Sequence, residues 1–200
     1  EDWPRALDYL VKAAQKATQA FGLRQALELY AEALAAARQL GDQVPVATVM
    51  MIHRARADLF FGVGEFNGSR AEAELLVDLA RRVHDQTAEA GALIQVAQAY
   101  QWLEEFPSAK ARVNQALDIA GAAGAKAEMG GALYIRGYIQ GLNAALEDAE
   151  VDLRRAREIG RAVADPSLQA LSLHLLSLRE SWQGRYDEGL RLAEDCVRLS

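Results

Sequence analysis

The sequence predicts an all-α fold, an α-α superhelix of about ten antiparallel helices in five repeats of about 40 residues. A small residue recurs once per repeat, at Ala26, Ser69, Ala109, Ala149 and Gly189, with separations of 43, 40, 40 and 40 residues. A second small residue stands twelve positions before each of these, at Ala14, Ala57, Ala97, Gly137 and Ser177. Paired small residues let two helices of a hairpin approach closely, because larger side chains would overpack the contact. No strand pattern competes with this periodicity.

Ten helices follow from this register, and turn signals separate them. The expected ranges are 3–19, 23–40, 46–62, 67–84, 87–103, 107–122, 126–142, 147–163, 166–182 and 186–199. Gly64 and Gly184 stand where a helix often ends with a positive φ. Asp165 is the expected N-cap of the helix that Pro166 opens. Pro45 lies in the three-residue excess between the first two repeats, which predicts a longer loop there.

A large apolar residue precedes each second-helix small residue by three positions. These residues are Leu23, Phe66, Phe106, Leu146 and Tyr186, and we expect each to wedge between the helices of its hairpin. We expect residues 1–200 to form a single array that is a fragment of a longer multidomain protein. The last helix presents Leu190, Ala193, Val197 and Leu199, whereas solenoids normally end in polar caps. This apolar end also allows two copies to associate.

Composition narrows the classes of partner. The chain is 51% hydrophobic and 25% charged, with one cysteine, no apolar run long enough to span a membrane and no signal-peptide pattern. We therefore expect a cytoplasmic protein without membrane contact. A net charge of −6 argues against direct binding of nucleic acid. The local cluster of Arg154, Arg155, Arg157 and Arg161 alternates with Glu150, Asp152 and Glu158, which is typical of a solvated helix face with pairs such as Arg154–Glu158.

Motifs for catalysis are missing from the sequence. It contains no phosphate-binding GxxxxGK[ST], no HExxH and no GxSxG. The histidines His53, His84 and His174 lack the spacing of metal ligands, and His84 is expected at an exposed helix end. We therefore expect no enzyme activity, no metal and no cofactor.

The central repeat, AQAYQWLEEFPSAKARVNQALDIA at 97–120, resembles a tetratricopeptide (TPR) unit. The marks of that family are the small residue and tyrosine of the first helix, Ala97 and Tyr100, and the alanines of the second, Ala109 and Ala116. The resemblance extends over all five repeats. It implies a TPR-like solenoid that binds partners and does not catalyse a reaction.

In TPR proteins the first helix of each pair lines a concave groove, and the resemblance carries these groove positions over. They are Arg54, Asp58, Phe61, Gln98, Gln101, Trp102, Tyr134, Tyr138, His174 and Trp182, with Met51, Gly62, Ile94, Leu142, Leu178 and Ser181 beside them. Trp102 and Trp182 have an alternative interpretation as packing residues near helix ends. Tyr134 and Tyr138, one helical turn apart, are the stronger candidates for ligand contact. The Lys, Arg and Asn pattern of a carboxylate clamp is missing at Ile94, Gln98, Tyr134 and Tyr138.

The long repeats and the opening WPRALDYLVKAAQKATQAFGLRQALELYAEAL are similar to C-terminal arrays of bacterial signalling proteins. Two groups share this likeness: class III adenylate or guanylate cyclases joined to an ATPase, and LuxR-type ATP-binding activators of the maltose-regulator kind. This resemblance implies a protein-interaction and sensor module that binds a protein segment or a neighbouring domain of the parent protein. The alternative that it implies is an inducer site for a small molecule in the same groove.

Overall fold

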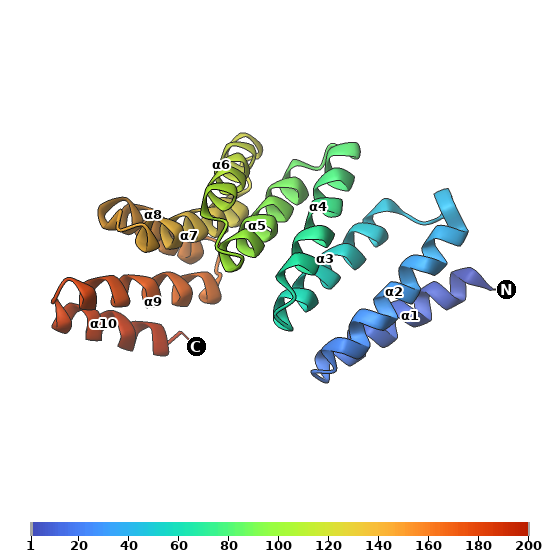
Figure 1. The fold of residues 1–200 in the computed structure, drawn as a ribbon, viewed down its shortest axis with the longest axis horizontal. Coiled ribbons are helices and arrows are strands. Elements are labelled where there is room, and N and C mark those ends of the chain that lie inside the picture. The colour runs from blue at the N-terminus through green and yellow to red at the C-terminus, as the bar shows by residue number, and fades with distance from the viewer. Residues whose placement is uncertain (1, 200) are drawn as a thin grey trace. The chain divides into compact units, whose positions relative to one another are not determined.

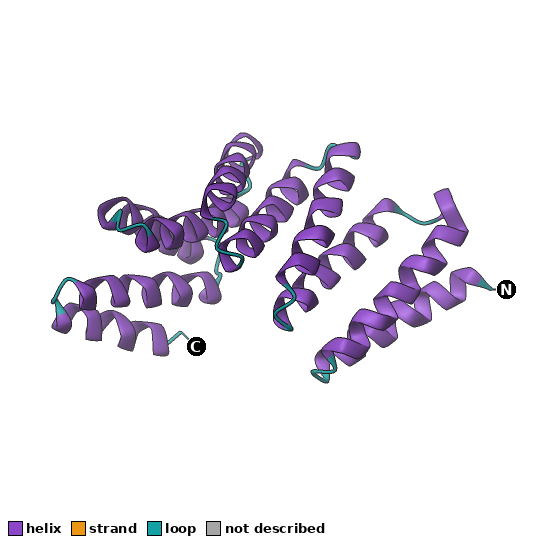
Figure 2. Ribbon diagram, viewed as in Figure 1, coloured by secondary structure: helices purple, strands orange, loops and turns teal. Residues whose placement is uncertain are grey.

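A computed structural model describes residues 2–199 of the chain. Ten α-helices and one short 3-10 helix account for its regular structure, with no strand in the described residues (Figure 2). The helices are α1 (Trp3–Gln19), α2 (Leu23–Leu40), α3 (Val46–Gly62), α4 (Phe66–Arg82), α5 (Gln86–Trp102), α6 (Phe106–Ala123), α7 (Lys126–Leu142), α8 (Leu146–Ala162), α9 (Pro166–Trp182) and α10 (Tyr186–Val197). The all-α superhelix of ten helices is confirmed, and every bound lies within two residues of the predicted one.

The chain divides into two compact units, with the boundary between Leu103 and Glu104. In the first unit α1 packs on α2, α2 on α3, α3 on α4 and α4 on α5, in chain order (Figure 1). In the second unit the same order runs from α6 to α10. The first helices of neighbouring repeats also touch, since α3 contacts α5 and α7 contacts α9. Each unit is therefore a stack of antiparallel helices in which most contacts are between chain neighbours, as in repeat proteins.

Small residues hold the paired helices together, as the period predicts. Within the hairpins that lie inside one unit, the residues Ala14, Ala26, Ala57, Ser69, Gly137, Ala149, Ser177 and Gly189 are all buried. A Cβ atom at Gly137 would lie 2.8 Å from Cγ of Leu153 and 3.2 Å from the carbonyl oxygen of Ala149. The hydroxyl of Ser177 donates a hydrogen bond to the carbonyl oxygen of Gly189 at 2.8 Å. These contacts leave no room for larger residues.

Each loop between helices contains one residue with positive φ. The residues are Phe21, Gly41, Gly64, His84, Glu104, Gly124, Ala144, Ala164 and Gly184, with φ between 56° and 78°. The residue after most of them donates its backbone N–H to a carbonyl five positions earlier, as Ala145 does to Gln140 at 2.9 Å. This is the hydrogen bond of a Schellman helix end, and it confirms the turns predicted at Gly64 and Gly184.

Two junctions confirm further predictions. The Oδ1 atom of Asp165 accepts the backbone N–H of Leu168 at 2.9 Å, so Asp165 caps the helix that Pro166 opens. The predicted longer loop before Pro45 contains the 3-10 helix Gly41–Gln43.

Two side-chain predictions are wrong in part, although Arg154, Arg155 and Arg161 are exposed as expected of a solvated face. Leu23, Phe66, Phe106 and Leu146 are half-buried at the starts of their helices, but Tyr186 is 71% exposed. The turn before Tyr186 is held instead by a contact between Arg185 and Glu180. Asp152 is buried against Arg136 and does not belong to a solvated face, and Arg154 pairs with Glu150 at 2.8 Å in place of Glu158.

Substitution of Gly137 by Ala should lower the free energy of unfolding by about 1–3 kcal/mol, because the new methyl group overpacks the contact with Leu153. Gly141 is the matched control, since a Cβ atom there meets nothing within 4 Å. Gly141→Ala should raise the free energy of unfolding by up to about 1 kcal/mol through helix propensity. Urea unfolding followed by circular dichroism measures both, and equal effects of the two substitutions would contradict the close contact.

Ala144→Gly should stabilise the protein by about 0.5–1 kcal/mol. Ala144 has a φ of 59°, a conformation that costs an L-residue about 1–2 kcal/mol, and the relief exceeds the added entropy of the unfolded chain. Ala123→Gly, in the exposed last turn of α6, should instead destabilise by about 0.5–1 kcal/mol. Opposite signs in thermal unfolding support the assignment, and a loss of stability at both positions would overturn it.

Candidate functional site

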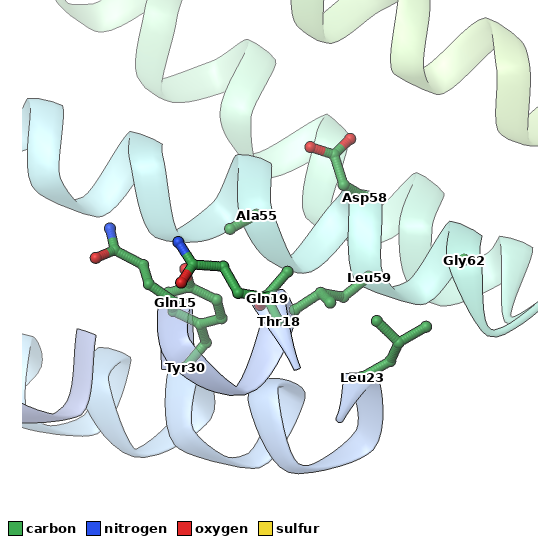
Figure 3. Close-up of a pocket in the computed structure, with 9 residues that line it drawn as sticks. All are labelled: Gln15, Thr18, Gln19, Leu23, Tyr30, Ala55, Asp58, Leu59 and Gly62. Carbon is green, nitrogen blue, oxygen red and sulfur yellow. The ribbon is translucent and has the colours of Figure 1, made fainter. Parts of the chain in front are cut away.

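The first helices of the hairpins are α1, α3, α5, α7 and α9, and we call the side of each unit that they form its first-helix face. On this face the first unit contains a cavity of about 660 Å³. Gln15, Thr18 and Gln19 come from α1, Leu23 and Tyr30 from α2, and Ala55, Asp58, Leu59 and Gly62 from α3. Figure 3 shows the side chains of Gln15, Gln19 and Tyr30 close together, with Asp58 pointing away from them. The cavity therefore has amide groups and a phenol on one side and a carboxylate on the other.

Tyr30 is the buried polar group of this cavity. The residue is only 3% exposed, and its hydroxyl has no hydrogen bond to any of residues 2–199. Burial raises the pKa of Tyr30, so the phenol stays protonated and can donate a hydrogen bond. The hydroxyl is therefore available to a molecule bound in the cavity.

Asp58 lies where the TPR resemblance places a groove residue. Its Oδ1 atom accepts a hydrogen bond of 2.6 Å from Nε2 of Gln95 on α5. Burial raises the pKa of Asp58, and the hydrogen bond from Gln95 and the positive charge of the exposed Arg54 oppose that rise. Asp58 thus links α3 to α5 on the predicted face.

Three aromatic rings meet where α3 ends and α4 begins. The ring of Trp102 stacks on Phe66, with centroids 5.4 Å apart and planes 16° apart. Phe61 meets Phe66 and Trp102 edge to face at 5.4 Å and 6.1 Å. Trp102 nevertheless remains 54% exposed. It has a packing role on one face and an open surface on the other, so the two interpretations of Trp102 are compatible.

The two glutamines predicted on α5 differ in exposure. Gln98 is half-buried, whereas Gln101 is buried and its Oε1 atom has no hydrogen-bond partner in the described chain.

The first-helix face of the second unit contains a different, mostly apolar cavity of about 270 Å³ between α7 and α9. Its lining includes Tyr138, Leu142, Leu178 and Trp182, with Leu146, Ala149 and Leu153 of α8 below. Trp182 is 66% exposed and Leu142 is 50% exposed, so large apolar side chains surround the opening. Arg179 also lines the cavity, but its guanidinium binds Glu150 at 2.5 Å and Glu180 at 2.6 Å.

The other residues predicted for the groove of the second unit, Tyr134 and His174, do not line its cavity. Tyr134 is partly buried and packs against both apolar clusters of this unit, including Leu153 and Leu133. Burial, and then the neighbouring Tyr138, raise the pKa of Tyr134. His174 is exposed and lines neither cavity. Tyr138 and Trp182 are therefore brought together, whereas Tyr134 serves mainly the core.

Sequence reasoning missed the α1 side of the larger cavity. Gln15, Thr18 and Gln19 stand 43 positions before Asp58, Phe61 and Gly62. Extending the groove register one repeat toward the N-terminus would have found them. Tyr30 belongs to a second helix, and the sequence contains no signal that its hydroxyl faces a cavity.

Buried ion pairs hold the hairpins that carry these cavities. Glu72 on α4 binds Nδ1 of His53 and Nε of Arg56 on α3, each at 2.7 Å. The guanidinium of Arg56 also donates to the carbonyl oxygen of Leu27 at 2.9 Å. Burial by itself raises the pKa of Glu72, but the hydrogen bonds from His53 and Arg56 outweigh it and lower the pKa below its ordinary value.

The described residues contain no group of three or more His, Cys, Asp or Glu side chains that could hold a metal ion. None of the helices within residues 2–199 has the length and apolar character needed to cross a membrane.

Comparisons with known proteins establish the fold. No protein-family model matches the sequence, and no curated protein matches it. Among solved structures, the chain is similar to BtubC from P. vanneervenii, at 16% identity and a TM-score of 0.74, over 99% of this chain and 88% of BtubC. It is similar to a Rap protein complexed with competence and sporulation factor, at 12% identity and a TM-score of 0.82, over 97% of this chain but only 53% of the Rap protein.

A third similar structure is YrrB, described as a TPR protein with an unusual peptide-binding site, at 12% identity and a TM-score of 0.53, over 100% of this chain and 93% of YrrB. These likenesses confirm that the chain has the architecture of a TPR-like array.

Replacing Glu72 by Gln should destabilise the first unit by about 2–4 kcal/mol at pH 7, because Arg56 and His53 lose their buried carboxylate. Since the folded-state pKa of Glu72 is lowered, its stabilisation is present above the ordinary value of 4.5 and is lost as the pH falls through the folded pKa. The difference between wild type and variant should therefore shrink below about pH 4.5. Urea titrations at several pH values test this, with the exposed Asp78→Asn on the same helix as control. A pH-independent difference would contradict the assigned pKa.

Proposed function

We propose that this chain is a non-catalytic interaction module that binds a segment of a partner protein on its first-helix face. The observation that carries the proposal is the apolar cavity of the second unit, with Tyr138 in its lining and the exposed Trp182 at its opening. Exposed apolar groups around a hollow are characteristic of binding surfaces. The cavity is of the size of one large apolar side chain.

Energetics favour these aromatic residues as anchors. A tryptophan buries about 150–250 Å² when covered, and two thirds of Trp182 is open to solvent. At about 25 cal/mol per Å², covering it contributes about 3 kcal/mol before the entropic cost of association. Trp102 presents a similar open face in the first unit. Few other contacts would be needed for specific binding, because a small number of anchors dominates most interfaces.

We also propose the kind of parent protein to which this chain belongs. The resemblance of the opening stretch to arrays of bacterial cyclases and LuxR-type activators supports a cytoplasmic signalling protein as parent, with residues 1–200 as one TPR-like array. A partner segment or a neighbouring domain of the parent would then occupy the first-helix face. The peptide-binding site named for YrrB, a protein of the same architecture, supports this class of partner.

A small-molecule inducer is the second candidate for the first-helix face. The observation that favours it is the 660 Å³ cavity of the first unit, with the unpartnered hydroxyl of Tyr30. That volume lies in the usual range of ligand pockets, about 300–1,000 Å³.

Selection from a display library of random linear peptides tests the leading proposal. Selected peptides should be enriched in bulky apolar residues, and isothermal titration should show at least tenfold weaker binding to Tyr138→Ala and Trp182→Ala with unchanged helical circular dichroism. Tyr9→Ala, which removes an exposed aromatic ring outside both cavities, is the matched control.

Binding that survives Tyr138→Ala and Trp182→Ala would refute the groove assignment. Loss of helicity in these variants would show that the residues belong to the core. Binding of a small molecule that requires Tyr30, tested by Tyr30→Phe, would favour the inducer function.

A further inference from the structure

A third cavity, of about 460 Å³, lies in the second unit among α6, α7 and α8. It shares no lining residue with the apolar cavity of Tyr138 and Trp182. Most of its lining surface is apolar, but five polar side chains take part: Lys110 from α6, Arg136, Gln140 and Asn143 from α7 or the turn after it, and Asp148 from α8. Phe106, Pro107 and Ile139 supply an apolar wall. The repeated architecture allows this place to be compared with the same place in other repeats.

In the second repeat an aromatic ring fills the equivalent space. Gln140 corresponds to Phe60, Asp148 to Gly68 and Lys110 to Leu27. The ring of Phe60 lies so close to Gly68 that a Cβ atom there would be 2.8 Å away, and the guanidinium of Arg56 lies over the ring at 5.3 Å from its centroid. Leu27 is buried. The ring of Phe60 and the guanidinium of Arg56 therefore occupy this space in the second repeat.

In the third and fifth repeats, the residues equivalent to Gln140 and Lys110 interact in other ways. In the third repeat these residues are Tyr100 and Arg70, and the guanidinium of Arg70 lies over the ring at 5.1 Å. In the fifth repeat they are Glu180 and Glu150, and both carboxylates bind Arg179, at 2.6 Å and 2.5 Å. In each case the two positions are bridged, by a cation–π contact or by a shared arginine.

The fourth repeat lacks such a bridge. The buried Oε1 atom of Gln140 has no hydrogen-bond partner in the described residues. Lys110 is exposed and forms no ion pair with any residue between 2 and 199. The guanidinium of Arg136 is already engaged by both oxygens of Asp152, at 2.6 Å and 2.8 Å. Compared with the second repeat, polar groups thus stand at three positions together. Lys110 and Asp148 are open to solvent, with Asp148 near the charge of Arg136, whereas Gln140 Oε1 is buried without a protein partner in the described residues.

The chemistry of these groups selects the ligand. Lys110 offers a free ammonium group to an anion, whereas Gln140 Oε1 and the carboxylate of Asp148 accept hydrogen bonds from a cation. An anion alone would meet Asp148 unfavourably, and a cation alone would meet Lys110. A ligand with one negative group, one positive group and an apolar part can interact favourably with Lys110, with Gln140 and Asp148, and with the apolar wall.

We propose that this cavity binds a free α-amino acid, with its carboxylate on Lys110, its ammonium on Gln140 and Asp148, and its side chain against Phe106 and Pro107. The site is separate from the first-helix face and does not depend on the function proposed for that face. A bound amino acid would link α6, α7 and α8, so it would stabilise the second unit in proportion to its occupancy.

Titration of the whole chain with L-leucine and L-phenylalanine tests the proposal, by calorimetry and by ¹H–¹⁵N NMR of the side-chain amide of Gln140. Acetate, butylamine and inorganic phosphate are the single-charge probes. Both amino acids should bind and shift the Gln140 amide, and each single-charge probe should bind at least tenfold more weakly. Failure of both amino acids to bind, or equal binding of acetate or phosphate, would overturn the proposal.

Two variants locate the site. Gln140→Phe combined with Asp148→Gly reproduces the closed packing of Phe60 and Gly68, so the protein should keep its thermal midpoint and lose amino-acid binding. Lys110→Met changes only an exposed cation and should weaken binding at least tenfold, whereas Lys126→Met, an exposed lysine outside the cavity, should leave it unchanged. Unchanged affinity in Lys110→Met, or in a folded closed variant, would contradict the assignment.

Discussion

The close approach of the two helices in each hairpin is the contact on which the rest of the structure depends. Gly137 lies against Leu153 and the backbone of Ala149, and the hydroxyl of Ser177 reaches the carbonyl oxygen of Gly189 across the next hairpin. A contact this short tolerates only small residues and fixes how far one helix can slide along the other. The positions of both turns follow from it, which explains why each loop reaches positive φ at a corresponding residue.

Once the hairpin contact is fixed, other positions of the repeat are free to diverge. The position of Phe60, Tyr100, Gln140 and Glu180 shows this most clearly, because ring packing, a cation–π contact, a cavity and an ion network all occur there. Stability in repeat proteins is approximately a sum of local terms, so one junction can lose packing without unfolding its neighbours. The fourth repeat can therefore contain a cavity and remain folded, because side chains fill the equivalent space in the adjoining repeats.

Backbone features were predictable from the sequence, whereas cavities were not. The period of the small residues gave all ten helices, because it reports a steric constraint that acts in every repeat. The same register placed Asp58, Tyr138 and Trp182 on the first-helix face but could not tell Tyr138, which lines a cavity, from Tyr134, which packs mainly on the core. Tyr186 failed for a related reason, since the Arg185–Glu180 contact that holds its turn is specific to one repeat. Cavities arise where one repeat departs from the pattern. The period of the sequence reports only the features that all repeats share, so it does not predict these departures.

Buried ion pairs affect which helices of the array pair with one another. Arg56–Glu72 in the second repeat and Arg136–Asp152 in the fourth occupy equivalent positions, whereas the fifth repeat has Leu176 and Leu192 there, both buried in one apolar cluster. Burying charges is costly, and an apolar pair of similar volume is often at least as stable. Repeats with similar apolar faces can pair with the wrong neighbour during folding. A carboxylate in α4 or α8 that pairs with an arginine of its own hairpin penalises pairing with the fifth repeat, because Leu176 or Leu192 would leave a buried charge unmatched. The ion pairs thus act on which helices associate, and the small residues act on how closely they do so.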